Sequence, residues 1–268
     1  MFGKIRAAYQ LFPRHGHPII VLCRSVIPFH VSVIPCTKMD IKLPQPLKAA
    51  LIDMDGVLFD SMKLHTLAWK RMVEEQGIAC TREEFYLYEG MTGPATINLI
   101  WERERGFKPS EEEARRLYRI KAAYFKEMES PAMIPGASTV TSTLRKAGIR
   151  CVLVTGSAQS SLLRRIDGEY RGVFAQEDRV TALDVTHGKP HPEPYLRGLE
   201  KAGAKASEAI VIENAPLGVK AAKAAGCFTV AVMTGPIQRK DFEEAGADII
   251  YESMNDFAVA LPALLSSM

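Results

Sequence analysis

The sequence predicts an α/β protein, a Rossmann-like doubly wound parallel sheet core with an inserted α-helical cap domain. From residue 131 onward, short apolar runs typical of buried strands alternate with segments of helical periodicity, which indicates a parallel sheet covered on both faces. One earlier apolar run, residues 49–52, is separated from the others by a long helical stretch. We therefore assign residues 47–60 and 131–268 to the core and residues 61–130 to the cap.

The cap is predicted to contain four helices. Apolar residues recur at helical spacing through residues 64–73, which predicts the first helix. The second helix is expected to start after the capping residue Thr81, and the fourth after the capping residue Ser110. The third is expected over residues 96–104. The boundary signals are Gly77 as a stop, Thr81 and Ser110 as N-caps, and residues 90–94 as a break.

The core is predicted to continue as alternating helices and strands after residue 131. Helices are expected over residues 138–147, from residue 159 and from residue 195, and strands over residues 150–154, 209–212, 227–233 and 248–251. A short strand and a turn are expected within residues 174–181. The sequence contains no internal repeat, no P-loop and no glycine fingerprint of a dinucleotide-binding fold.

Composition narrows the class of protein. The chain has 268 residues, of which 47% are hydrophobic and 24% are charged, as in ordinary globular proteins. The basic excess lies in residues 1–46, so the remainder is mildly acidic and we expect no nucleic-acid partner. Five cysteines without a Cys-x-x-Cys pair favour a reduced, cytoplasmic protein. We also expect a monomer that does not bind membranes.

Residues 1–46 differ from the rest of the chain. They contain several prolines and basic residues, and their longest apolar run, residues 19–23, is too short to span a bilayer or to form a signal peptide. We expect a disordered or non-native leader outside the fold, with Met39 as a candidate start. A targeting arm or membrane-surface arm is the alternative. A chain beginning at Met39 is expected to fold and keep full activity.

Two aspartates end the first predicted strand. Asp53 and Asp55 are followed by Gly56, which lets the chain turn. In an open parallel sheet, chemistry takes place beyond the carboxyl ends of the strands. One carboxylate there can act as a nucleophile and the other as an acid and base, and together they can hold a hard cation such as Mg²⁺.

Three further polar positions follow strands or precede helices. Thr155, with Ser157 close by, follows the strand at residues 150–154 and suits a phosphate oxygen. Lys189 would neutralise an aspartate or a phosphate, and Glu213 and Asn214 offer oxygen ligands for Mg²⁺. Taken singly, these residues have ordinary explanations as a helix cap, a solvated charge and a turn. Their shared placement indicates one site.

These motifs resemble those of the haloacid dehalogenase superfamily of phosphotransferases, and the helical insert resembles the C1 cap of its subclass I. The motifs are Asp53-Met54-Asp55-Gly56-Val57, Val154-Thr155-Gly156-Ser157, Gly188-Lys189-Pro190 and Val211-Ile212-Glu213-Asn214-Ala215-Pro216-Leu217-Gly218-Val219. The resemblance implies that Asp53 is the nucleophile and Asp55 the general acid and base. It implies that Thr155 and Lys189 hold the phosphoryl group.

The resemblance also implies a Mg²⁺ site formed by the Asp53 carboxylate, the Asp55 carbonyl and Asn214, with Glu213 nearby. Many relatives carry Glu-Asp where this chain has Glu213-Asn214, so the site loses one negative charge. On the first cap helix, His65 resembles a histidine of β-phosphoglucomutase that contacts the acid and base aspartate. A partly buried structural histidine is the alternative.

Glu89 is expected to restore the missing charge. If cap closure brings its carboxylate onto Mg²⁺, the cavity shrinks and favours a small leaving group, a combination that resembles subclass I inorganic pyrophosphatases. We therefore predict Mg²⁺-dependent hydrolysis of inorganic pyrophosphate through an aspartyl-phosphate intermediate. The alternatives are a β-phosphoglucomutase or small sugar-phosphate phosphatase, with a small phosphorylated substrate in each case, and a catalytically silent binding protein. For Glu89 itself the alternative is a solvated loop acid.

Overall fold

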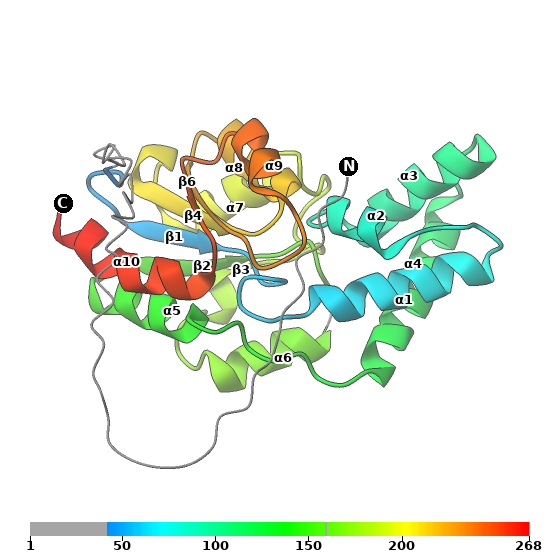
Figure 1. Cartoon of the computed structure of the whole chain (residues 1–268), viewed down its shortest axis with the longest axis horizontal. Coiled ribbons are helices and arrows are strands. Elements are labelled where there is room, and N and C mark those ends of the chain that lie inside the picture. The colour runs from blue at the N-terminus through cyan, green and yellow to red at the C-terminus, as the bar shows by residue number, and fades with distance from the viewer. Residues whose placement is uncertain (1–41, 159, 268) are drawn as a thin grey trace, which may run out of the picture. The chain divides into compact units, whose positions relative to one another are not determined.

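The computed structural model describes residues 42–158 and 160–267, and a six-stranded parallel sheet lies at the centre of this region (Figure 1). The strand order is β3-β2-β1-β4-β5-β6, and every pairing is parallel. The strands are β1 (Ala49–Ile52), β2 (Arg150–Val154), β3 (Arg179–Val180), β4 (Ala209–Glu213), β5 (Phe228–Val232) and β6 (Ile249–Tyr251). The predicted α/β fold class is confirmed.

Helices cover both faces of the sheet, as Figure 1 shows. Alternate strand residues point to opposite faces. Ile52 therefore packs in one core cluster with α5 (Ala137–Lys146), α6 (Ser160–Glu169) and α10 (Met254–Ser266). Leu51 packs in another with α7 (Glu193–Ala202) and α8 (Pro216–Ala224), and α9 (Arg239–Ala245) adds a smaller cluster beside α8. Short 3-10 helices, η1 (Gln176–Asp178) and η2 (Ala206–Glu208), precede β3 and β4.

The cap consists of four helices with an apolar core of their own. They are α1 (Met62–Glu75), α2 (Arg82–Leu87), α3 (Gly93–Arg105) and α4 (Glu111–Glu127). Trp69, Phe85 and Leu117, from three of these helices, share this core. The Thr81 and Ser110 side chains accept hydrogen bonds from the backbone three residues on, as expected of N-caps.

The predicted elements agree closely with the structure at β1 and β2, and within two residues at β4, β5 and β6. The short strand predicted within residues 174–181 is β3. Residue 159, the predicted start of a helix, lies outside the described residues, and α6 is seen from Ser160.

Most of the predicted leader lies outside the described residues, so its expected disorder and its alternatives stay predictions. Leu43 is the exception, because its side chain is 3% exposed and belongs to the main core cluster. The predicted core and cap boundaries also remain predictions. In the described part of the chain, no helix combines the length and the apolar character needed to cross a bilayer.

Candidate active site

The register of the sheet brings the predicted strand-end residues together. Ile52 pairs with Leu153 on one side and with Ile212 on the other. The residues that follow β1, β2 and β4 therefore meet at one edge of the sheet. All nine predicted site residues lie there or in the adjoining cap, and all are buried: Asp53, Asp55, His65, Glu89, Thr155, Ser157, Lys189, Glu213 and Asn214.

An ion-pair network fixes Asp53, the residue directly after β1. The Lys189 ammonium group donates to Asp53 Oδ1 at 2.5 Å and to Glu213 Oε1 at 2.6 Å. Burial lowers the pKa of Lys189, but the two carboxylates outweigh it and the pKa is raised. The lysine therefore stays protonated and leaves the Asp53 carboxylate oriented by a permanent positive charge.

The Glu213 carboxylate is fully engaged. Its Oε1 atom also accepts a hydrogen bond from the Tyr195 hydroxyl at 2.6 Å, and its Oε2 atom accepts from the next two backbone N–H groups at 3.0 and 3.1 Å. Gly218 on α8 makes room for it, because a Cβ atom there would lie 1.9 Å from Oε1. These contacts favour a role in positioning Lys189 over the predicted metal contact, which remains untested.

Asp55 is held by hydrogen bonds from both the core and the cap. Its Oδ1 atom accepts from Ser61 Oγ at 2.6 Å and lies 2.9 Å from His65 Nε2, while Thr155 Oγ1 lies 3.4 Å from Oδ2. Burial raises the pKa of Asp55, but His65, Ser61 and the more distant Lys121 charge together lower it. In this arrangement Asp55 is ionised, which is the form that can accept a proton from water.

Lys121 on α4 is a site residue that sequence reasoning missed. Its Nζ atom lies 2.5 Å from His65 Nδ1, its side chain is buried, and burial lowers its pKa to about 7. Burial and the Lys121 charge also lower the pKa of His65, whose ring stacks on Phe125 at 4.1 Å. A signal was present in the sequence, because Lys121 interrupts an apolar stripe between Leu117 and Phe125 at helical spacing.

Glu89 and Asn214 meet across the boundary between cap and core. The Asn214 Nδ2 group donates to Glu89 Oε1 at 2.8 Å. Burial raises the pKa of Glu89 well above its ordinary value, Asn214 opposes this, and the nearby carboxylates add to it. Gly56, with φ of +76°, lets the two approach, because a Cβ atom there would lie 2.0 Å from Asn214 Nδ2.

This corner of the site fits a hard divalent cation. Asn214 Oδ1 is buried and has no hydrogen-bond partner within residues 42–158 and 160–267. The carboxylates of Asp53 and Asp55 lie close enough to Glu89 to raise its pKa, and Asp55 also raises the pKa of Asp53, which a cation would relieve. Carboxylate and amide oxygens are the ligands that Mg²⁺ prefers. The residues present therefore match the predicted cofactor.

The cap loop between α2 and α3 closes over the residues predicted to bind phosphate. A Cβ atom at Gly156 would lie 2.5 Å from the Gly90 carbonyl oxygen, and one at Gly188 would lie 2.8 Å from the Thr92 nitrogen. Two core glycines thus permit this close approach. Thr155 Oγ1 accepts a hydrogen bond from the Ser157 backbone at 3.0 Å, beside the loop.

The cap and the core line a small, partly open cavity of about 60 Å³ beside Asp53 and Asp55. This is room for about four waters, or for a group the size of phosphate. Core residues form one wall and cap residues the other, including Thr155 and Ser157 from the core and Trp69, Tyr88, Tyr118 and Lys121 from the cap.

Comparison with known proteins identifies the family. The family model for haloacid dehalogenase-like hydrolases matches residues 47–226. The chain belongs to this family. Hexitol phosphatase A of Escherichia coli (strain K12) is 32% identical to this hydrolase over 218 residues, covering 79% of this chain and 94% of the relative. β-Phosphoglucomutase of Bacillus subtilis (strain 168) is 24% identical over 223 residues, covering 80% and 93%.

A solved structure extends this similarity. A Bacteroides vulgatus protein provisionally named as a β-phosphoglucomutase is 45% identical, with a TM-score of 0.79, and the match covers 82% of this chain and 90% of that protein. The predicted superfamily is confirmed, and the hydrolase is a phosphatase or phosphotransferase of this family. The predicted preference for inorganic pyrophosphate gains no support from these relatives, and the alternative, a sugar-phosphate enzyme, fits them better.

Proposed function

We propose that this hydrolase removes phosphate from small phosphorylated sugars or polyols and uses Mg²⁺. The observation that carries the chemistry is the buried Asp53 carboxylate, held at 2.5 Å from Lys189 in the site that Asp55 shares. The substrate class rests on similarity to hexitol phosphatase A. The cap wall of the cavity is consistent with it, because Trp69 and Tyr118 combine apolar rings with polar tips beside Lys121.

The reaction that this arrangement supports has two steps. Asp53 attacks phosphorus, an aspartyl-phosphate bond forms, and the bond from phosphorus to the leaving oxygen breaks as Asp55 gives that oxygen the proton it took from water in the preceding turnover. Water then attacks the same phosphorus, its proton passes to Asp55, and the Asp53 carboxylate is released. Lys189 and Thr155 hold the phosphoryl oxygens in both steps.

Asp53, Asp55, Asn214 and Glu89 are the residues that would hold the Mg²⁺ ion. When bound, the cation offsets the repulsion between these carboxylates and an anionic phosphate. Glu213, by contrast, is proposed to act through Lys189. We extend the proposal to a cytoplasmic monomer, which size-exclusion chromatography with light scattering would test for oligomeric state.

A substrate panel tests the proposal. Release of inorganic phosphate would be measured with Mg²⁺ for hexitol phosphates, hexose phosphates and pyrophosphate, and conversion of β-glucose 1-phosphate to glucose 6-phosphate would be followed separately. We expect the highest kcat/KM for a hexitol or hexose phosphate. Conversion of β-glucose 1-phosphate to glucose 6-phosphate without release of phosphate would identify a mutase. Inactivity on every compound would favour the silent binding protein.

Pyrophosphate hydrolysis remains a second candidate because of one observation. The buried Glu89 carboxylate reaches Asn214 at 2.8 Å, beside a cavity of only about 60 Å³. A carboxylate there would repel an anionic substrate unless it binds the cation, and it leaves little space for a sugar. A kcat/KM for pyrophosphate above that for every ester in the same panel would establish this candidate over the first.

A further inference from the structure

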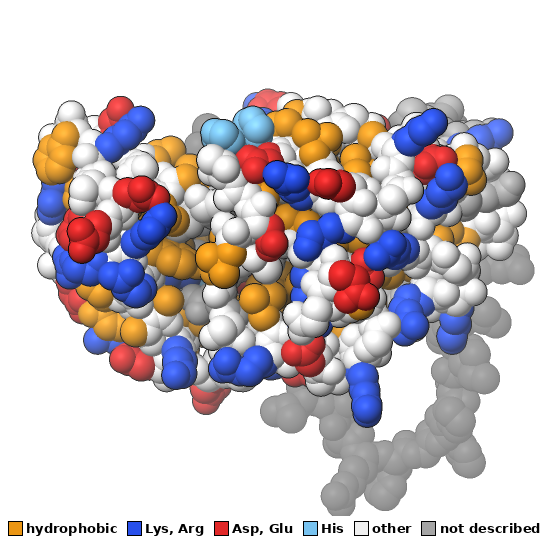
Figure 2. All heavy atoms as spheres, turned by 180° about the vertical axis from the view of Figure 1, so that it is seen from behind, with side chains coloured by type: hydrophobic (Ala, Val, Ile, Leu, Met, Phe, Trp, Pro, Cys, Tyr) orange, Lys and Arg blue, Asp and Glu red, His pale blue; other side chains and the backbone are white. Residues whose placement is uncertain are grey.

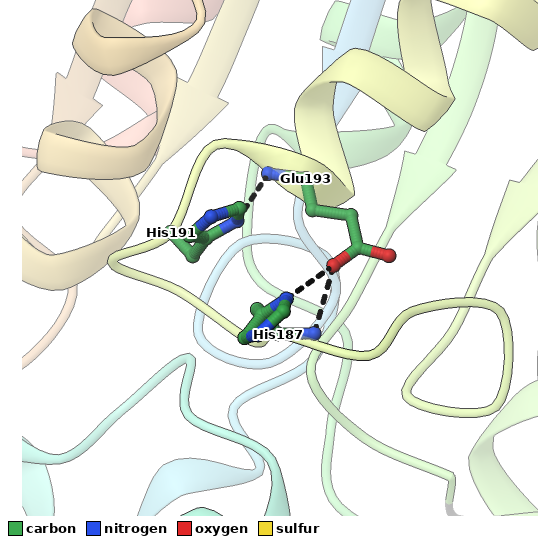
Figure 3. Close-up of side chains that lie close together, drawn as sticks. All are labelled: His187, His191 and Glu193. Atoms are coloured by element: carbon green, nitrogen blue, oxygen red, sulfur yellow. Dashed lines mark hydrogen bonds and ion pairs between the residues drawn. The ribbon is translucent and has the colours of Figure 1, made fainter.

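A cluster of metal-binding side chain types lies outside the active site, in the loop that precedes α7. His187, His191 and Glu193 each offer a ligand atom, and these atoms all lie within 4.8 Å of one another (Figure 3). Both histidines are exposed, and Figure 2 shows a pale blue histidine patch on the surface. No step of the proposed reaction uses these three side chains.

The backbone of this loop positions the ligands. Glu193 Oε1 accepts a hydrogen bond from the Thr186 N–H group at 3.0 Å, and Oε2 accepts from the His187 N–H group at 2.8 Å. The first residue of α7 thus closes the loop on itself. His191 is fixed by its N–H bond to the Gly188 carbonyl at 3.0 Å and by the contact of its Nδ1 atom with the Glu193 N–H group at 3.2 Å.

The distance between two of the ligand atoms is close to the distance between two ligands of one bound zinc ion. His187 Nδ1 lies 3.0 Å from Glu193 Oε2, whereas two ligand atoms on one tetrahedral zinc ion lie about 3.3 Å apart. The His187 and His191 rings lie 4.6 Å apart between centroids and are inclined by 34°. Small rotations of the two exposed imidazole rings would bring the ligand nitrogen of His191 within coordination distance of the same ion.

The ligand types select the class of cation. Two imidazole nitrogens and one carboxylate oxygen suit Zn²⁺, Ni²⁺ or Cu²⁺, whereas Mg²⁺ prefers oxygen ligands alone. Glu193 is ionised at neutral pH like any partly exposed glutamate, and the backbone N–H groups of Thr186 and His187 lower its pKa further, to about 2. The loop therefore differs from the carboxylate corner at Asn214, which fits Mg²⁺.

We propose that His187, His191 and Glu193 form a surface site for one divalent transition-metal ion of the zinc class. The ion takes the place of the hydrogen bond between His187 Nδ1 and Glu193, with the imidazole proton then on Nε2, and joins both histidines to the start of α7. The catalytic Lys189 lies in the same loop, between the two histidines. The site is separate from the magnesium-binding corner in both position and ligand chemistry.

Titration calorimetry with Zn²⁺ on the untagged, full-length chain tests this site, with excess Mg²⁺ present to occupy the carboxylate corner. We expect the wild type to bind one Zn²⁺ ion per chain at this site. In His187→Ala and in His191→Ala, that binding should be lost or the Kd for Zn²⁺ should rise about 10- to 100-fold. Zn²⁺ should also raise the Tm of the wild type, and the double variant should lose this rise. Glu193 is left intact because its carboxylate also holds the loop backbone.

The matched control is Glu200→Ala, which removes an exposed acid on α7 that is not part of the cluster and should bind Zn²⁺ as the wild type does. Both cluster histidines are exposed, so the variants are expected to keep the wild-type Tm in the absence of Zn²⁺. Equal Zn²⁺ affinity and stoichiometry in the wild type and the double variant would overturn the proposal. Absence of Zn²⁺ binding to the wild type would overturn it as well.

Discussion

The core wall and the cap wall of the active site hold their charges in opposite ways. In the core wall, Lys189 lies between Asp53 and Glu213, so each buried charge has a partner of opposite sign. In the cap wall, Glu89 faces carboxylates, and Lys121 faces the neutral ring of His65. The pKa of Glu89 is raised and that of Lys121 is lowered, so both environments disfavour the charged form.

This difference indicates which wall depends on ligands. The core wall pairs its buried charges and fixes them by hydrogen bonds, which offsets part of the cost of burying them, although burial still raises the pKa of Asp53. The cap wall brings buried like charges together when it closes, which is unfavourable until a cation or a phosphate changes the balance. We infer that ligands stabilise the closed cap, while the strand ends of the core are pre-organised.

The largest expected effect follows from removing the nucleophile. Asp53→Asn keeps the size of the side chain but removes the oxygen nucleophile, so phosphate release should fall about 10⁴-fold or more. Steady-state kinetics with the best substrate of the panel would measure this. Asp60→Asn is the matched control, since Asp60 belongs to the same segment but pairs with the exposed Lys63. Activity of Asp53→Asn within tenfold of the control, about 1.4 kcal/mol, would contradict the assignment.

The next largest effect concerns Lys189, and it tests the ion pairs of the core wall separately from the nucleophile. Lys189→Met leaves Asp53 and Glu213 buried without a cation, so the free energy of unfolding should fall by about 3–5 kcal/mol. Loss of a phosphate-binding group should also lower kcat by about 10²–10³-fold. Denaturant unfolding and kinetics would measure the two quantities.

Lys63→Met is the control for the Lys189 variant. Lys63 is an exposed lysine on α1, and its loss should change the free energy of unfolding by less than about 0.5 kcal/mol. If both variants were equally stable, the core wall would not depend on its ion pairs in the way described here.

The same contrast explains what the sequence could predict. Asp53, Thr155 and Glu213 lie at the ends of strands β1, β2 and β4, and parallel topology brings such residues to one edge whatever their separation along the chain. Strand ends are visible in the sequence as apolar runs that stop at polar residues. The core wall was therefore predictable from the sequence.

The cap wall has no comparable rule. Lys121 reaches His65 only because α1 and α4 pack side by side, and helix packing does not specify which residues meet across it. The orientation of Glu213 toward Lys189 was also missed, because the adjacent Asn214 suggested a shared metal role. α8 was not predicted either, and Gly218 within it is an atypical residue for a helix interior.

Glu89 offers a more selective test of the cap wall. Glu89→Ala should sharply lower pyrophosphate hydrolysis and leave sugar-phosphate hydrolysis unchanged or improved, because it removes a cation ligand and enlarges the cavity. The apparent Mg²⁺ affinity should fall about 10- to 100-fold. Kinetics on both substrates across a Mg²⁺ titration would measure these changes.

Glu112→Ala is the matched control for this variant, because Glu112 is an exposed acid in the first turn of α4 that lines neither the cavity nor the corner at Asn214. It should behave as the wild type on both substrates. Equal loss of both activities in Glu89→Ala would count against the metal-ligand role and would leave Glu89 as an ordinary packing residue.

The smallest expected effect concerns the protonation of the cap wall. Lys121→Met removes a positive charge that lowers the pKa of His65, so the His65 pKa should rise. Titration of the imidazole ring by NMR would measure the shift. Lys126→Met, an exposed lysine on the same helix, should leave the His65 titration unchanged.

The sign of the pH effect on stability follows from the Lys121 pKa. In the unfolded chain this lysine keeps its proton up to its ordinary pKa of 10.5, whereas in the folded protein burial lowers the pKa to about 7. Between these values the unfolded state binds more protons, so the folded state gains stability as the pH rises. Below about pH 7 Lys121 is protonated in both states, and the folded state bears the full free-energy cost of burying its charge.

The free energy of unfolding of the wild type, relative to Lys121→Met, should therefore increase from about pH 7 to about pH 9. Parallel pH profiles for the two proteins would show that the Lys121 charge is already compensated in the closed cap, and the contrast between the two walls would then rest on Glu89 alone.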